Sequence, residues 1–111
     1  MNTVKINVNY LVPPALDWVV CVCEKTQMGA YTRYSTEWAH GGPIIEREWL
    51  DITPWPNESR EDMRWHCQQH DSGGDCAQYG PTPLIAAMRC YVASKLGKIV
   101  EVPRELYKEE A

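Results

Sequence analysis

The chain has 111 residues, enough for one hydrophobic core and too few for two, so a single domain is expected over residues 1–111. Hydrophobic residues make up 44% and charged residues 23%, a composition that excludes wholesale disorder. Fifteen acidic against eleven basic side chains give a net charge of −4, which disfavours broad nucleic-acid binding because a phosphate backbone repels negative charge.

The first elements are indicated by periodicity. Residues 4–8 alternate apolar and polar side chains, the pattern of a half-buried strand. Pro13 and Pro14 follow, and proline is compatible with a first helical turn, so a helix is expected over residues 14–25, ending before Gly29. Its inward stripe consists of Leu16, Val19, Val20 and Cys23, and Asp17 suits the positive end of the helix dipole.

The middle of the chain has no clean period. Residues 30–42 are polar and aromatic and end in two glycines, which predicts a loop. The pattern of residues 43–47 is compatible with a helical turn that begins at Pro43 and equally with a strand. Pro54 and Pro56 then punctuate TPWPNESRED, which predicts a solvated turn region.

A second alternating segment lies at residues 63–67 and predicts a half-buried strand. The stretch that follows, HDSGGDCAQYG, is rich in glycine, aspartate and serine and predicts a mobile loop. Near the end of the chain, residues 99–102 predict a last strand, which Pro103 terminates, and residues 104–111 form an acidic tail that frays.

The clearest helix covers residues 82–96, where apolar side chains recur at steps of three and four and Gly97 stands where a left-handed cap is expected. The order strand, helix, irregular middle, strand, helix, strand indicates an α+β domain. We expect a small antiparallel or mixed sheet packed against two main helices.

The cysteines indicate a reducing compartment. An odd number of cysteines without a secretory signal argues against a disulfide framework. No stretch of about 18 consecutive apolar residues occurs, so no membrane partner is expected. We therefore expect a cytosolic protein with reduced thiols at Cys21, Cys23, Cys67, Cys76 and Cys90.

The first candidate site is the entrance to the helix over residues 82–96. Thr82 can cap this helix while Pro83 takes its first position, and the amide N–H groups that follow then point outward at the positive end of the dipole. That geometry suits a weak anion site, and Arg89 lies about two turns further along. The alternative is helix capping alone.

The second candidate is the stretch STEWAHGGPIIERE. Its two adjacent glycines let backbone approach a ligand closely, and Trp38 offers a flat stacking face. The alternative is a structural turn with an aromatic plug and a surface charge pair. Donors for a planar, phosphorylated molecule would come from Arg33, His40 and Arg47 beside Gly41 and Gly42.

A metal site is considered because His66, Cys67, His70 and Cys76 lie within eleven residues. The alternating pattern sends His66 and Cys67 to opposite faces, however, and no Cys-x2-Cys pair is present, so neither a metal nor another cofactor is expected. No nucleophile elbow, phosphate loop or metalloprotease helix occurs either. We expect binding rather than catalysis.

Three blocks of the sequence resemble one family. ALDWVVCVCEK, YSTEWAHGGPIIERE and GPTPLIAAMRCYVASKLG together cover about two-fifths of the chain and are similar to the NinX-like family of small proteins from tailed phages of enteric bacteria. The resemblance implies a small accessory protein, made in the cytosol of an infected bacterium, that counters a host function. It supplies no catalytic residues, and the His and Cys residues between positions 49 and 79 lie outside it.

Together these features favour a protein that sequesters, without catalysis, a nucleotide-like anionic small molecule such as a host defence signal, in a pocket that two subunits of a homo-oligomer could share. One alternative is an inhibitor or adaptor that docks a basic host enzyme through an acidic surface with Trp49, Trp55 and Trp65 partly exposed. A small nucleotide hydrolase is a third. The expected ligand-binding residues are Arg33, Tyr34, Trp38, His40, Gly41, Gly42, Arg47, Thr82 and Arg89.

Overall fold

The computed structural model describes residues 2–25, 32–55, 60–70 and 76–107. Within these ranges it contains three helices and five strands, which confirms the expected α+β class. The helices are α1 (Ala15–Glu24), α2 (Trp38–Glu48) and α3 (Pro83–Leu96). The strands are β1 (Thr3–Asn7), β2 (Leu50–Pro54), β3 (Trp65–Gln69), β4 (Gln78–Gly80) and β5 (Ile99–Pro103).

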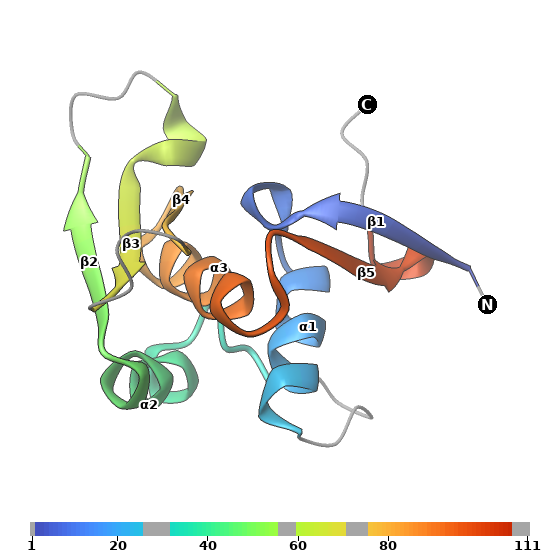
Figure 1. The fold of residues 1–111 in the computed structure, drawn as a ribbon, viewed down its shortest axis with the longest axis horizontal. Coiled ribbons are helices and arrows are strands. Elements are labelled where there is room, and N and C mark those ends of the chain that lie inside the picture. The colour runs from blue at the N-terminus through green and yellow to red at the C-terminus, as the bar shows by residue number, and fades with distance from the viewer. Residues whose placement is uncertain (1, 26–31, 56–59, 71–75, 108–111) are drawn as a thin grey trace.

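Two separate antiparallel sheets lie on either side of α3 (Figure 1). In the first, β1 pairs with β5 and Lys5 stands opposite Glu101. In the second, the strand order is β2-β3-β4, and Cys67 of the central strand stands between Ile52 and Gln78. The expectation of a small antiparallel sheet is confirmed, but the strands divide between two sheets.

Helix α3 forms the centre of the core. Thr82 caps it as predicted, because its Oγ1 accepts a hydrogen bond from the Ile85 N–H at 3.1 Å, and Pro83 takes the first position. All of residues 84–93 are buried, since α3 packs against both sheets and both other helices. A helix buried on every side needs apolar or small residues all round, which Ala86, Ala87 and Ala93 provide. Among the described residues, no helix has the length and apolar character to cross a membrane.

Each helix is followed by a residue with positive φ. Lys25 follows α1 at φ 58°, Trp49 follows α2 at φ 56°, and Gly97 follows α3 at φ 89°. Gly97 has the predicted positive φ, but its ψ of −174° lies outside the left-handed helical region. Trp49 is the unusual case, because a bulky side chain rarely adopts this conformation.

The predicted loop over residues 30–42 is wrong in its last part, because α2 begins at Trp38. Residues 30 and 31 lie outside the described ranges. Of the two alternatives for residues 43–47, the helical one is correct.

A close contact explains why α2 tolerates its two glycines and Pro43, which would weaken an isolated helix. Gly41 packs against the Tyr34 carbonyl and the Leu84 side chain of α3, where a Cβ would have no room. Tertiary packing therefore decides the local structure here.

Two short strands were not predicted. β2 extends into the expected turn region, and β4 forms the last three residues of the expected loop, Gln78–Gly80. The strand expected at residues 63–67 is displaced, because Met63 belongs to a 3-10 turn and β3 begins at Trp65. Residues 56–59 and 71–75 of the expected turn and loop lie outside the described ranges.

Candidate functional site

A pocket of about 230 Å³ lies between the first turns of α2 and α3. Its lining comes from two segments far apart in the sequence, and both were singled out from the sequence. Trp38 is 55% exposed, so much of its ring surface is open to a ligand. The lining residues are Ser35, Thr36 and Trp38 on one side and Thr82, Pro83, Leu84 and Ile85 on the other.

A buried hydrogen-bonded pair fixes the α2 side of this pocket. The Asp17 carboxylate of α1 is 5% exposed, and its Oδ1 accepts from the Ser35 N–H at 2.9 Å and from the Ser35 hydroxyl at 2.7 Å. Hydrogen bonds to a charged acceptor are stronger than neutral ones, so the turn is held firmly. This role of Asp17 was missed, although a carboxylate beside an apolar helix stripe is a signal for a buried partner.

The pocket lies at the positive end of two helix dipoles, because α2 begins at Trp38 and α3 begins at Pro83. Pro83 has no N–H and the Ile85 N–H is used by Thr82, which leaves the Leu84 N–H as the first-turn amide that α3 can offer an anion. The pocket therefore combines an aromatic face with a weak preference for negative charge.

Arg33 is the predicted cation nearest to this pocket along the chain. Its carbonyl accepts from the Thr36 N–H at 3.3 Å and from the Glu37 N–H at 3.0 Å, so it begins the turn that presents Thr36 and Trp38. Its side chain is exposed. Arg33 does not line the pocket, and it stands two residues before Ser35, the first lining residue along the chain.

Four other predicted residues do not line the pocket. Tyr34 is buried at 8% exposure, and its ring meets the His40 ring edge-to-face at 6.4 Å between centroids. His40 also stands 3.5 Å from the Glu37 carboxylate. Gly41 is a packing contact between α2 and α3, and Gly42 is half-buried with open space where a Cβ would stand.

Arg47 and Arg89 are engaged elsewhere. Arg89 is 3% exposed and donates from Nε to the Leu11 carbonyl at 2.8 Å and from Nη1 to the Tyr79 carbonyl at 2.7 Å. Burial lowers the pKa of Arg89 to about 10. Both arginines were expected to neutralise phosphate, but the structure gives them contacts within the protein.

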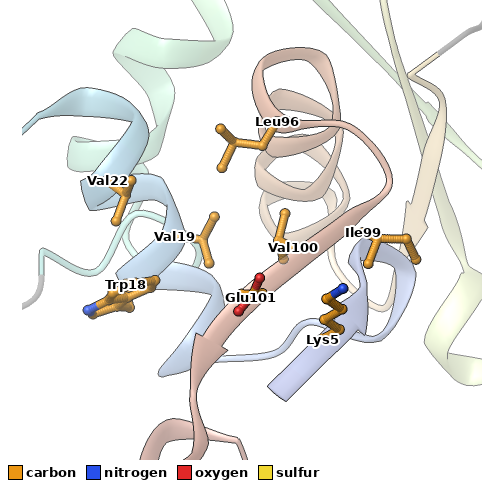
Figure 2. A pocket seen from close by; sticks show the side chains of 8 residues that line it. All are labelled: Lys5, Trp18, Val19, Val22, Leu96, Ile99, Val100 and Glu101. Atoms are coloured by element: carbon orange, nitrogen blue, oxygen red, sulfur yellow. The ribbon is translucent and has the colours of Figure 1, made fainter. Parts of the chain in front are cut away.

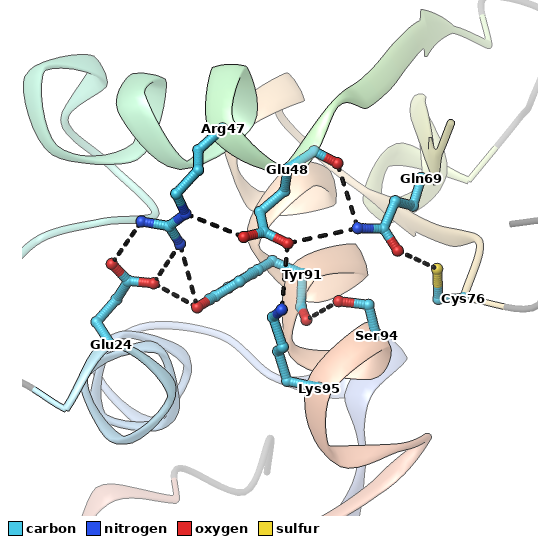
Figure 3. Close-up of polar contacts among 8 residues, drawn as sticks. All are labelled: Glu24, Arg47, Glu48, Gln69, Cys76, Tyr91, Ser94 and Lys95. Carbon is cyan, nitrogen blue, oxygen red and sulfur yellow. Dashed lines mark hydrogen bonds and ion pairs between the residues drawn. The ribbon is translucent and has the colours of Figure 1, made fainter. Parts of the chain in front are cut away.

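Arg47 belongs to a polar network that joins all three helices (Figure 3). Its guanidinium donates to both oxygens of Glu24, at 3.1 Å and 2.6 Å, and to Glu48 at 3.0 Å. The Tyr91 hydroxyl donates to Glu24, and Lys95 stands 3.3 Å from Glu48. This network fastens α1, α2 and α3 together.

The network does not provide a general base. Hydrogen bonding from Arg47 holds the pKa of Glu24 below its ordinary value. Burial would raise the pKa of Glu48, but hydrogen bonds from Arg47 and Lys95 outweigh burial and leave that pKa lowered too. Carboxylates held in the charged form accept protons poorly at neutral pH, so Glu24 and Glu48 act as structural anions.

The lowered pKa values predict a loss of stability in acid. Between the folded and unfolded pKa values the unfolded chain binds more protons, so the free energy of unfolding falls as pH drops from about 5 through the folded pKa values. Arg47→Gln removes the main cause and should flatten this dependence, whereas Arg60→Gln at an exposed pair should not. Urea unfolding at pH 7 and pH 3.5 checks this; equal acid sensitivity in Arg47→Gln and the wild type would contradict it.

A second hollow, of about 410 Å³, lies between α1 and β5 (Figure 2). Trp18, Val19 and Val22 approach it from α1, and Leu96 lies across from them at the end of α3. Lys5 and Glu101 add charged groups at one side. Val22, Leu96 and Ile99 are 41%, 48% and 56% exposed, so this hollow is an open apolar surface.

Three aromatic rings gather on the outer face of the β2-β3-β4 sheet. His66 lies 4.9 Å from Tyr79 and 5.4 Å from Trp55 between ring centroids. This cluster could not be predicted without β4, which brings Tyr79 beside His66. Cys67 is buried on the opposite face of β3, as the alternation predicted.

The chain was also compared with known proteins. The family model described as Bacteriophage P22, NinX matches residues 7–95, which is most of the chain. The chain belongs to the NinX family. The matched residues include the pocket between α2 and α3 and the whole β2-β3-β4 sheet, whereas β5 and all of β1 except Asn7 lie outside the match. The resemblance seen in three blocks therefore extends through the middle of the chain. No curated protein matches the chain.

Proposed function

We propose that this NinX protein is a phage accessory protein that captures a small planar molecule with an anionic group, without transforming it. The pocket between α2 and α3 is the site. The observation that carries the proposal is that Trp38 and Thr82, which are 44 residues apart in the sequence, line one pocket.

The chemistry of the lining favours such a ligand. An exposed tryptophan ring stacks on any flat heterocycle, and this contact is worth about 1–3 kcal/mol per base. Two helix starts and the Leu84 N–H favour a negative group beside that ring. A volume of about 230 Å³ is below the usual range of ligand pockets, which suits one base and its nearest phosphate, with the rest of the ligand outside. A nucleotide that serves as a host defence signal fits this description.

Calorimetry against a panel of cyclic and linear nucleotides tests the proposal. We expect one member to bind the wild type and Trp38→Ala to bind it at least about tenfold more weakly, because the stacking contact is lost. Trp49→Ala is the matched control, since Trp49 is 68% exposed and does not line the pocket. Arg33→Ala should weaken binding mainly at low salt, where exposed charges are least screened.

The result can also contradict the proposal. Folded wild type that gives no heat with any nucleotide would count against capture, as would equal losses in Trp38→Ala and Trp49→Ala. Recovery of an altered nucleotide after prolonged incubation would favour the hydrolase alternative.

A second candidate function is docking to a host protein, and the open apolar hollow between α1 and β5 favours it. Docking would be supported by a single stoichiometric partner, captured from host lysate, whose complex survives the addition of nucleotide and is abolished by Leu96→Asp.

A further inference from the structure

Strand β2 is the outermost strand of its sheet (Figure 1). The hydrogen bonds at its two ends show which backbone groups face β3. The His70 N–H donates to the Trp49 carbonyl at 2.8 Å, and the Trp55 N–H donates to the Arg64 carbonyl at 2.7 Å. Antiparallel pairing alternates at every second residue, so residues 51 and 53 also face β3. Leu50, Ile52 and Pro54 therefore direct their backbone groups to the open edge.

The opposite edge of the same sheet is closed by side chains. The Tyr79 N–H of β4 donates to Asn9 Oδ1 at 3.4 Å, and its carbonyl accepts from Arg89 at 2.7 Å. No comparable bond to Leu50 or Ile52 is formed within the described ranges. Among the described residues, the β4 edge is thus satisfied by side chains, whereas the N–H and C=O groups of Leu50 and Ile52 at the β2 edge have no such partner, which is a template for another strand.

The open edge is self-complementary about Ile52. Antiparallel pairing of two copies places residues opposite each other when their numbers sum to twice 52, so Ile52 meets the partner's Ile52 and Leu50 meets the partner's Pro54. Under the same rule Trp49 meets the partner's Trp55. Trp49 and Trp55 flank β2, and their rings lie beside His70 and His66, at 5.7 Å and 5.4 Å between ring centroids. The two tryptophans are 68% and 42% exposed.

We propose that two copies of this chain form a dimer by pairing their β2 strands antiparallel about a two-fold axis at Ile52. The pairing gives a continuous six-stranded sheet with four new backbone hydrogen bonds. The Ile52 N–H of each copy donates to the carbonyl of the partner's Ile52, and the Leu50 N–H of each copy donates to the carbonyl of the partner's Pro54. Pro54 has no N–H, so it ends the pairing.

The dimer accounts for the exposure of two tryptophans. Trp49 holds a conformation that costs a bulky residue about 1–2 kcal/mol, and it remains 68% exposed with its ring beside His70. Pairing brings it against the partner's Trp55, and aromatic cross-strand pairs stabilise sheets. The inference is independent of the nucleotide pocket, which lies at the helix starts rather than at this edge.

One exposed position tests the register. Thr53 stands opposite the partner's Asp51 in both halves of the dimer, in the closer, non-hydrogen-bonded type of pair. Thr53→Asp creates two like-charge pairs and should raise the dimer dissociation constant about tenfold, whereas Thr53→Lys creates two attractive pairs and should lower it. At high salt the dimer dissociation constants of the two variants should become similar, because salt screens the charges.

Sedimentation equilibrium measures these constants. We expect the wild-type mass to rise with concentration from 12.7 kDa toward twice that value, and the Ile52 amide to become protected from hydrogen exchange over the same range. A wild type that stays monomeric at millimolar concentration would overturn the proposal. So would a dimer that dissociates equally in Thr53→Asp and Thr53→Lys.

Discussion

Arg89→Ala is expected to lower the free energy of unfolding by about 4 kcal/mol, a large share of the roughly 5–15 kcal/mol that holds a domain together. The substitution leaves the Leu11 and Tyr79 carbonyls without their donor and opens a cavity beside α3. The first lost contact joins α3 to the segment before α1, 78 residues away in the sequence, and the second joins α3 to β4. The variant should therefore melt roughly 10–20 °C below the wild type.

Two further variants separate the causes of this loss. Arg89→Lys keeps the charge but cannot span both carbonyls, so we expect an intermediate loss. Arg64→Ala removes an exposed arginine side chain and should change stability by no more than about 0.5 kcal/mol. A denaturant midpoint for Arg89→Ala equal to that of the wild type would show that the buried guanidinium contributes nothing to stability.

Gly41→Ala and Gly42→Ala should change stability in opposite directions. A Cβ at Gly41 would lie 2.5 Å from Leu84 Cδ1 and closer still to the Tyr34 carbonyl oxygen, which is backbone and cannot move aside easily. We expect a loss of about 2–3 kcal/mol, because overpacking outweighs the better helix propensity of alanine. At Gly42 nothing lies within 4 Å of the added Cβ, so propensity alone acts and stability should rise by about 0.5–1 kcal/mol.

Gly41 also lies beside the pocket, because it packs against Leu84, which is one of the lining residues. Gly41→Ala should therefore also weaken ligand binding at temperatures where the variant is folded, while Gly42→Ala should bind as the wild type does. Thermal unfolding followed by calorimetry checks both effects. Equal behaviour of the two alanine variants would contradict the packing role of Gly41.

Much of the fold could be predicted because local signals agreed with tertiary structure. For α3, the capping threonine, the proline at the first position and the glycine after the last turn all mark its ends. For β1 and β5, alternation places each strand to within one residue, since Ile6, Val100 and Val102 are buried and Lys5 and Glu101 are exposed. These elements could be predicted without knowing which other elements they pack against.

The missed elements depend on contacts that the sequence does not display. Helix α2 contains Gly41, Gly42 and Pro43, and it forms because Gly41 fits against Tyr34 and Leu84. Strand β4 has three residues and no readable period, and its outer edge depends on Asn9 and Arg89. Propensity is a weak guide where packing decides.

The candidate site was predicted in part for the same reason. Trp38 and Thr82 could be chosen because a flat ring and a capped helix start are local features. The roles of the arginines could not be assigned, because the sequence does not show whether an arginine side chain binds a ligand, a carboxylate or a backbone carbonyl. In the structure Arg47 meets Glu24, and Arg89 meets two carbonyls.

The central claim is that ligand enters between the first turns of α2 and α3, and the five tryptophans provide a direct test. Each indole N–H gives its own signal in a ¹H–¹⁵N correlation spectrum. The signal that disappears in Trp38→Phe is the one from Trp38. Titration with the nucleotide that binds should shift the Trp38 indole and the Leu84 and Ile85 amides, and leave the Trp49 and Trp55 indoles in place. Shifts confined to Trp49, Trp55 or Trp18, with Trp38 unmoved at saturation, would contradict the account.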